Sequence, residues 1–175
     1  MRNHAMADHH DEHNYNVMAD DVIRFADEQG LDKFTVMGHS MGGRTAMTIA
    51  CRYPERVDGV ISIDAAPVDE SFEIEQFGSF AQAVLDFLFE LKEENQGITY
   101  NQVMEAADKF FNSKPQLRAL VSRSLALDQE NGSDDPAKWL VNVRTLRDEF
   151  TNIPYFDENL SFEGPGLNIV GERSR

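Results

Sequence analysis

The chain has a single cysteine, no long apolar run and no visible leader, and each of these scarcities excludes a class of protein. Cys51 alone cannot form an internal disulfide and fits a reducing compartment, so we expect an intracellular protein of the cytoplasm or the mitochondrial matrix. No apolar stretch approaches the roughly 20 residues that a membrane helix needs, so we expect no transmembrane segment. The first residues have no apolar core of a secretory signal, and no targeting segment is visible.

Basic residues are also scarce. Lys and Arg total 16 against 31 Asp and Glu, which gives a formal net charge of −15. Nucleic acids and anionic membrane surfaces would repel such a chain, so we expect neither as a partner. The composition is otherwise that of a globular protein, with 41% hydrophobic residues, and 175 residues suffice for one domain with a sizeable core.

The first third of the chain alternates between helix and strand patterns. Residues 15–29 have the spacing of an amphipathic helix closed by Gly30. Residues 33–37 and 57–63 are apolar strand candidates, and a helix of small residues is expected over 42–52 between them. A strand, a helix and a second strand form a βαβ unit, so we predict an α/β protein whose parallel sheet is covered on both faces. The buried face of the first helix is expected to carry Met18, Val22, Phe25 and Ala26.

The pattern from residue 69 to about residue 150 is helical only. Asp134-Asp135-Pro136 resembles a helix start and predicts a last helix through Trp139, Val143, Leu146 and Phe150. A Gly-Pro-Gly turn at 164–166 and a short strand at 167–170 follow. Three strands leave the edges of a parallel sheet open, so we expect a piece of a larger domain. Three further sets have helical spacing: Phe80, Val84, Phe87, Leu88 and Leu91; Val103, Ala107 and Phe111; and Leu117, Leu120 and Val121.

Residues 38–42 read Gly-His-Ser-Met-Gly and lie between a predicted strand and a predicted helix. A strand-to-helix turn this tight needs small flanking residues and forces the serine into a strained conformation that exposes its hydroxyl. We therefore interpret the stretch as a nucleophile elbow with Ser40 as nucleophile. The backbone N–H of Met41 is then an oxyanion donor. The alternative is a glycine-rich loop that only turns a βα unit.

The elbow resembles that of the α/β-hydrolases. Further segments, among them residues 2–4 (Arg-Asn-His) and 62–68 (Ser-Ile-Asp-Ala-Ala-Pro-Val), resemble a subgroup of serine esterases. That subgroup comprises small bacterial acyl-ester and thioester hydrolases and mitochondrial relatives of the abhydrolase-domain class. The resemblance implies a partial α/β-hydrolase fold, with a core of residues 1–68 and 155–175 and a helical lid insertion over 69–154. It also implies that the chain is a fragment lacking the first strands and the C-terminal catalytic histidine.

Two candidates exist for the acid of a catalytic triad. Asp64 ends the strand beside the elbow strand, and the resembling subgroup uses an Asp there, so we favour Asp64. Glu172 is the alternative acid. A third interpretation is that Asp64 is a strand-end residue that only caps the turn after it. Ser174 stands where most α/β-hydrolases carry the acid, and it is a possible accessory residue.

No histidine follows Asp64, because all five lie within residues 4–39. Since the family order is serine, acid, histidine, the general base is expected outside this stretch, which alone should have little or no activity. His9, His10 and His13 match no compact metal spacing, so we expect a solvated loop and no metal. Cys51 is expected to be a buried structural thiol rather than a second nucleophile.

These observations predict a serine hydrolase of small-molecule acyl esters or thioesters that needs no cofactor. The alternative is a catalytically inactive α/β-hydrolase fragment that acts, if at all, as a binding module. A third possibility is a different chemistry on this fold, such as that of a cofactor-free haloperoxidase or a dehalogenase. The dehalogenase is disfavoured because it needs Asp rather than Ser at position 40. The aromatic residues of the helical insertion either line an acyl pocket or pack its helices together; they are Phe72, Phe77, Phe80, Phe87, Phe110, Phe111 and Trp139.

Overall fold

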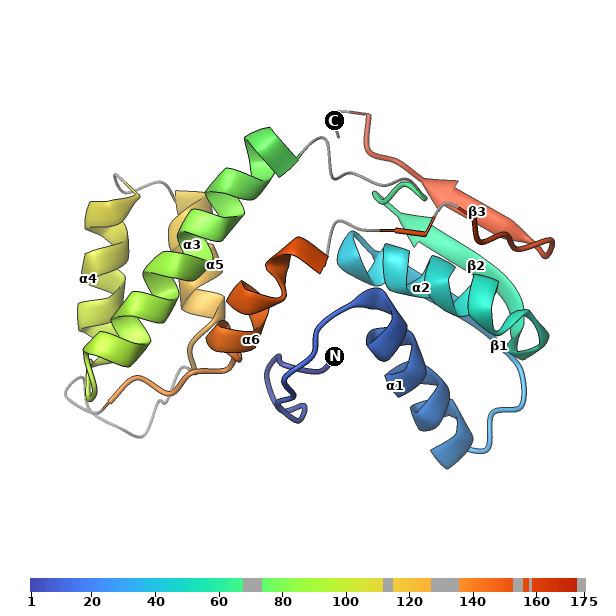
Figure 1. Cartoon of the computed structure of the whole chain (residues 1–175), viewed down its shortest axis with the longest axis horizontal. Coiled ribbons are helices and arrows are strands. Elements are labelled where there is room, and N and C mark those ends of the chain that lie inside the picture. The colour runs from blue at the N-terminus through green and yellow to red at the C-terminus, as the bar shows by residue number, and fades with distance from the viewer. Residues whose placement is uncertain (68–73, 112–114, 127–135, 153–155, 158, 173–175) are drawn as a thin grey trace. The chain divides into compact units, whose positions relative to one another are not determined.

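The computed structural model describes residues 1–67, 74–111, 115–126, 136–152, 156–157 and 159–172 (Figure 1). The chain divides into two compact units. The sheet unit consists of Met1, Glu12–Glu75 and Glu149–Arg175, and the helical unit consists of Arg2–Asp11 and Gln76–Asp148. The assignment of a core and a lid as functional domains stays a prediction.

The sheet unit contains the predicted βαβ arrangement. Its elements are α1 (Tyr15–Glu28), β1 (Phe34–His39), α2 (Met41–Arg52), β2 (Val57–Ile63) and β3 (Gly166–Ile169), with a short 3₁₀ helix at Pro54–Arg56. The strands pair in the order β1-β2-β3, and both pairings are parallel. The predicted α/β fold class with a parallel sheet is therefore confirmed.

Helices α1 and α2 cover one face of this sheet (Figure 1). Small residues of α2 allow the helix to approach the strands closely, and its fully buried Ile49 packs with Val36 and Val60. The other face is different: among the described residues, Met37 is 65% exposed and Leu167 is 55% exposed. The expectation of cover on both faces is thus wrong for the described part of the chain.

Helix α1 begins and ends where the sequence indicates. The side chain of Asn14 caps its start by accepting a hydrogen bond from the Val17 N–H at 3.1 Å, and Gly30 follows its end with φ of +67°. Met18 and Ala26 are buried as predicted, but Phe25 is 58% exposed. The prediction for Phe25 was wrong because helical spacing places it at the margin of the apolar stripe and not at its centre.

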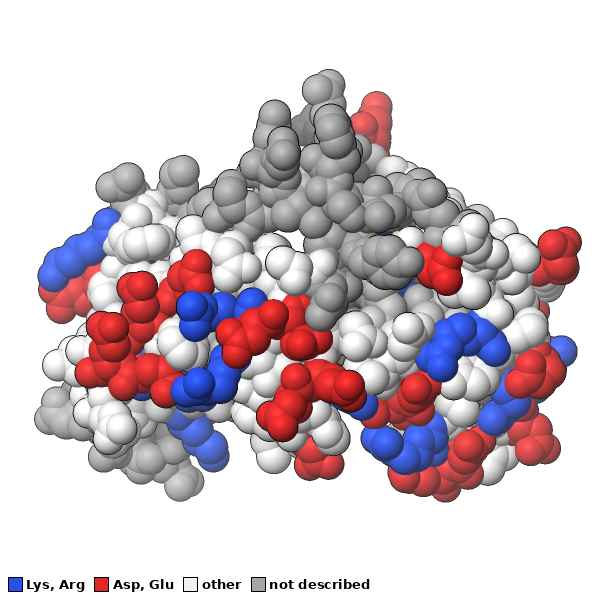
Figure 2. Space-filling model, viewed as in Figure 1, with Lys and Arg blue, Asp and Glu red and all other residues white. Residues whose placement is uncertain are grey.

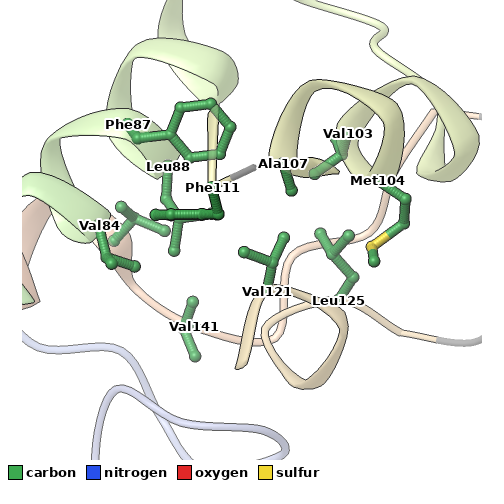
Figure 3. Packing of buried hydrophobic residues seen from close by; sticks show 11 residues of the cluster. Val84, Phe87, Leu88, Val103, Met104, Ala107, Phe111, Val121, Leu125 and Val141 are labelled. Carbon is green, nitrogen blue, oxygen red and sulfur yellow. The ribbon is translucent and has the colours of Figure 1, made fainter. Parts of the chain in front are cut away.

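The helical unit packs around one apolar cluster (Figure 3). Its long helices are α3 (Ile74–Glu94), α4 (Tyr100–Phe110) and α5 (Pro115–Arg123). A capping box between Thr99 and Gln102 starts α4. The cluster consists of Val84, Phe87, Leu88, Val103, Met104, Ala107, Phe111, Val121, Leu125, Val141 and Val143.

The last helix is much shorter than predicted. Helix α6 spans only Val143–Asp148, and a 3₁₀ turn covers Phe150–Asn152. Trp139 instead pairs with Leu125 in an isolated antiparallel bridge, and the neighbouring Leu140 N–H donates to the Ser124 carbonyl at 2.8 Å. The backbone groups before Val143 are thus satisfied by pairing rather than by a helix. Asp134 and Asp135 of the predicted start lie outside the described residues.

Aromatic residues of the helical unit contact one another. The rings of Phe87 and Phe110 stack with centroids 4.4 Å apart, and Phe111 meets both rings edge-on. These three side chains therefore pack helices α3 and α4 together, although Phe110 remains 52% exposed. Phe72 lies outside the described residues, as do the side chains of Phe77 and Phe80.

Charged side chains gather on the surface of both units (Figure 2). Many of the cations lie beside carboxylates: Arg147 donates to Asp86 at 2.7 Å in the helical unit, and Arg52 donates to Asp20 at 2.8 Å between α2 and α1. Such exposed pairs contribute about 0–1 kcal/mol each. No helix in the described part of the chain is both long and apolar enough to cross a membrane.

Candidate functional site

Ser40 and Asp64 follow the last residues of two neighbouring parallel strands. His39 of β1 is in register with Ile63 of β2, and the Ser40 N–H donates to the Ile63 carbonyl at 2.9 Å. The carboxyl ends of parallel strands meet at one edge of a sheet. The structure therefore brings the predicted nucleophile and the favoured acid to the same edge.

Ser40 has the strained backbone that the elbow interpretation requires. Its φ is +53° and its ψ is −121°, a conformation that costs a residue with a Cβ on the order of 1–3 kcal/mol. Ser40 also stands at the N-cap of α2, yet its side chain makes no capping hydrogen bond and the residue is exposed. Serine is a favoured N-cap because its oxygen accepts from the helix. Ser40 thus stands at a capping position without acting as a cap.

Two glycines make the elbow sterically possible. A Cβ on Gly38 would collide with the backbone carbonyl of Gly42, so β1 and α2 approach more closely than any other residue allows. A Cβ on Gly43 would lie 2.9 Å from the Cβ of Ala65 and 3.1 Å from the hydroxyl of Ser62. The first glycine permits the sharp turn, and the second lets α2 pack against the turn after β2.

Asp64 lies on a tight turn held by strand β3. Its φ is +53°, a left-handed conformation that Asp tolerates better than most residues. The Asp64 N–H donates to the Ile169 carbonyl at 2.7 Å, and the Gly171 N–H donates to the Asp64 carboxylate at 3.3 Å. The hydrogen bonds to Ile169 and Gly171 therefore hold the half-buried Asp64 at the end of the sheet.

Met41 is the first residue of α2 and is half-buried. The N–H groups of Gly43 and Arg44 both donate to the carbonyl oxygen of Ser40, at 2.8 and 3.1 Å. The first N–H groups of a helix have no acceptor within the helix, and they carry its positive dipole. The N–H of Met41 belongs to this first turn and therefore has no acceptor within α2.

The remaining candidates from the sequence are Ser174, Glu172 and the histidines. Glu172 directly follows Gly171, whose N–H donates to the Asp64 carboxylate, so Glu172 lies at the same end of the sheet as the favoured acid. Ser174 is among the residues that the structure does not describe, and Glu172 is exposed two residues before it. His4 is half-buried, with its Nδ1 3.0 Å from the Arg2 carbonyl oxygen, and His13 is fully buried. Within the described residues, no three His, Cys, Asp or Glu side chains come together as a metal site.

Cys51 lies in α2 and is half-buried. Burial raises the pKa of its thiol, because the thiolate would lose solvation. A raised pKa lowers the thiolate fraction at neutral pH and with it the nucleophilicity of the side chain. This direction of the shift fits the expected structural role.

The sheet unit also has a cavity of about 270 Å³. Tyr15, Thr48 and Phe156 line it together with neighbouring polar residues, and neither Ser40 nor Asp64 does so. The Thr48 hydroxyl at its wall already donates to the Arg44 carbonyl at 2.9 Å. We assign this cavity no part in the candidate site.

Sequence reasoning gave no role to Ser62. The residue is 3% exposed, and its hydroxyl donates to the Ala65 carbonyl at 3.0 Å, across the turn that holds Asp64. In the sequence, the sign of a role for Ser62 is that its hydroxyl is a single polar group within the apolar run Val-Ile-Ser-Ile of β2. A buried polar side chain in such a run needs a partner, and here the partner lies beside the candidate acid.

Comparison with known proteins gives consistent results. The sequence pattern of the alpha/beta hydrolase fold family matches residues 1–163. The esterase YbfF of Escherichia coli (strain K12) is 26% identical over 99% of this chain and 62% of its own length. The sn-1-specific diacylglycerol lipase ABHD11 of Xenopus laevis is 28% identical over 99% of this chain and 53% of its own length.

Two further proteins extend the comparison. Ethanol acetyltransferase 1 of Cyberlindnera jadinii is 28% identical over 99% of this chain and 56% of its own length. Among solved structures, a marine microorganism esterase superposes with a TM-score of 0.81 and 24% identity, over 98% of this chain and 64% of that one. The chain thus spans between about half and two thirds of the length of these relatives.

Proposed function

Because the chain belongs to the α/β-hydrolase fold family, we propose that it forms part of a serine hydrolase that cleaves carboxylic esters or thioesters. Relatives with the names esterase and diacylglycerol lipase support ester substrates. The observation that carries the proposal is the backbone of Ser40, with φ of +53° directly after a parallel strand and a hydroxyl not used for capping. The lid role of the helical unit is part of the same proposal.

The proposed reaction has two steps. The Ser40 oxygen attacks the acyl carbonyl carbon while its proton passes to a histidine, and the Met41 N–H stabilises the oxyanion. The bond to the alcohol or thiol then breaks, and the leaving group takes the proton from the histidine. Water attacks the acyl-serine in the same manner and releases the carboxylic acid. Asp64 orients the imidazole and stabilises its protonated form.

The histidine of this mechanism is not among residues 65–175, because all five histidines lie within residues 4–39. In the family order the histidine follows the acid. We therefore propose that the base comes from sequence beyond the 175 residues. Activity is therefore measured on the full-length gene product.

Replacement of Ser40 tests the proposal. We expect Ser40→Ala to reduce kcat for p-nitrophenyl esters and acyl thioesters by a factor on the order of 10³ or more, because the acyl-enzyme can no longer form. Steady-state hydrolysis measures this. Ser161→Ala is the matched control, since Ser161 is an exposed serine of the same unit outside helices and strands.

Two outcomes would contradict the proposal. One is a wild-type protein that folds but hydrolyses no ester or thioester, which would favour the non-catalytic alternative. The other is a Ser40→Ala variant that retains the wild-type rate.

A related activity has specific support. The similarity to ethanol acetyltransferase 1 favours acyl transfer from the same acyl-serine to an alcohol instead of water. The two reactions differ only in the second nucleophile. Addition of ethanol to the hydrolysis assay should then produce an ethyl ester at the expense of the free acid, and its absence would limit the protein to hydrolysis.

A further inference from the structure

The turn that carries Asp64 follows β2 directly and is closed by the buried hydroxyl of Ser62. Ser62 is 3% exposed and donates to the Ala65 carbonyl at 3.0 Å, so its hydrogen bond spans the turn with Asp64 inside it. Asp64 needs such support because its φ of +53° is unfavourable for a residue with a Cβ.

The same hydroxyl faces the nucleophile's helix. The Cα of Gly43 lies so close to Ser62 and Ala65 that a Cβ would stand 3.1 Å from the Ser62 hydroxyl and 2.9 Å from the Ala65 Cβ. The Ser40 N–H meanwhile binds the Ile63 carbonyl at 2.9 Å. Ser62 therefore lies at the contact between the elbow and the turn that carries the candidate acid.

We propose that Ser62 is a positioning residue for Asp64. By holding the Ala65 carbonyl, it fixes the direction in which the Asp64 carboxylate leaves the sheet relative to Ser40. The inference rests on the proposed function, since the placement of Asp64 affects catalysis only if Asp64 is the triad acid. Loss of the hydroxyl lets the turn relax, and a displacement of about 1 Å in a catalytic group lowers rates by up to about 10²-fold.

A double-mutant cycle tests this inference in the full-length gene product. The four proteins are wild type, Ser62→Ala, Asp64→Asn and the combination. Asn is chosen because it also tolerates a left-handed backbone but cannot supply the negative charge. We expect Ser62→Ala to lower kcat roughly tenfold in the wild-type background and less than about twofold in the Asp64→Asn background, because coupled residues are not additive.

A matched control separates positioning from general loss of a buried hydroxyl. Ser124 is 7% exposed and its hydroxyl donates to the Leu120 carbonyl at 3.1 Å, within the helical unit. Ser124→Ala therefore removes the same group with the same kind of acceptor, and kcat should stay within about twofold of wild type. If Ser62→Ala does not fold, Ser62→Cys enters the cycle in its place, since a thiol fills the same site but is only a weak hydrogen-bond donor.

The outcomes distinguish this inference from the proposed function. If hydrolysis does not depend on Ser40, the proposed function fails and the role of Ser62 fails with it. If hydrolysis depends on Ser40 but Ser62→Ala leaves kcat unchanged, only the positioning role is overturned. An equal fall in both backgrounds also overturns it, because Ser62 would then act independently of Asp64.

Discussion

Ser40 and Asp64 share an unusual backbone feature. Each is a non-glycine residue with φ of +53° directly after the last residue of a parallel strand. Each is also tied to the neighbouring strand by its own N–H, Ser40 to Ile63 and Asp64 to Ile169. The surrounding sheet thus holds two strained residues side by side, at a cost of about 1–3 kcal/mol each. Strain of this kind at a sheet edge is what we expect of residues retained for chemistry.

Replacement of Ser40 by glycine should relieve this strain and so make the folded protein more stable. We expect Ser40→Gly to raise the free energy of unfolding by about 1 kcal/mol, because glycine adopts a positive φ without steric cost. Thermal and urea unfolding measure it. Ser161→Gly is the control: Ser161 has no positive φ, so only the entropic cost of glycine remains and stability should fall slightly. A Ser40→Gly variant less stable than wild type would contradict the strain.

The residues of the site differ in how far the sequence predicts them. Ser40 is recognisable because glycines and an apolar strand surround it, and its strain was predicted and found. The position of Asp64 at the end of β2 was also predictable, because the strand-like segment 57–63 ends directly before it. Ser62 was not, because its role depends on a hydrogen bond across a turn whose shape no spacing rule gives. The catalytic roles themselves stay proposals.

At the scale of elements, the two glycines on either side of Ser40 contribute differently to the contact between β1 and α2. A Cβ on Gly38 would collide with the backbone of Gly42, whereas a Cβ on Gly42 would meet nothing within 4 Å. The strand β1 must therefore lack a side chain at Gly38, next to its last residue, whereas α2 has room for a side chain at Gly42.

Matched alanine substitutions test this contact. We expect Gly38→Ala to lower the free energy of unfolding by about 3 kcal/mol or more, because the backbone of α2 would have to move. Gly42→Ala should be neutral or stabilising by up to about 1 kcal/mol, since alanine is the better helix former. Urea unfolding measures both. Equal effects of the two substitutions would contradict the described packing.

The elements of the sheet unit were predicted better than the last helix. Strands β1 and β2 are short segments with several apolar residues, and α1 has clear signals at both ends, so local pattern and packing agree. Residues 136–142 show helical spacing too, but Trp139 pairs with Leu125 in an antiparallel bridge. The helix starts only after Asn142, whose side chain accepts a hydrogen bond from the Thr145 N–H at 3.4 Å. Pairing with a distant segment overrode the local pattern, and spacing alone does not reveal it.

At the scale of the whole molecule, residues 2–11 belong to the helical unit although they precede the sheet in the chain. The fully buried Asn3 accepts hydrogen bonds from the His10 N–H at 2.8 Å and from the Asn142 side chain at 3.2 Å. The Asn142 side chain also reaches the His10 carbonyl at 3.2 Å. This polar cluster holds the first residues against the start of α6.

Hydrogen exchange tests that attachment. We expect Asn142→Ala to speed exchange of the amides of Asn3 and His10 by roughly tenfold, because it removes hydrogen bonds worth about 1 kcal/mol each. Exchange in β1 should not change. Asn159→Ala is the control, since the Asn159 side chain bonds only locally to Asp157 in the sheet unit. Unaltered exchange at Asn3 and His10, or an equal increase in β1, would contradict the account.

The central claim is that Ser40 is the nucleophile, and covalent labelling tests it most directly. The full-length gene product is treated with a fluorophosphonate, and the site of the adduct is located by mass spectrometry of its peptides. We predict one phosphonyl group on Ser40, and no adduct in the Ser40→Ala variant. An unmodified Ser40 in a protein that hydrolyses esters, or an adduct on another serine, would contradict the claim.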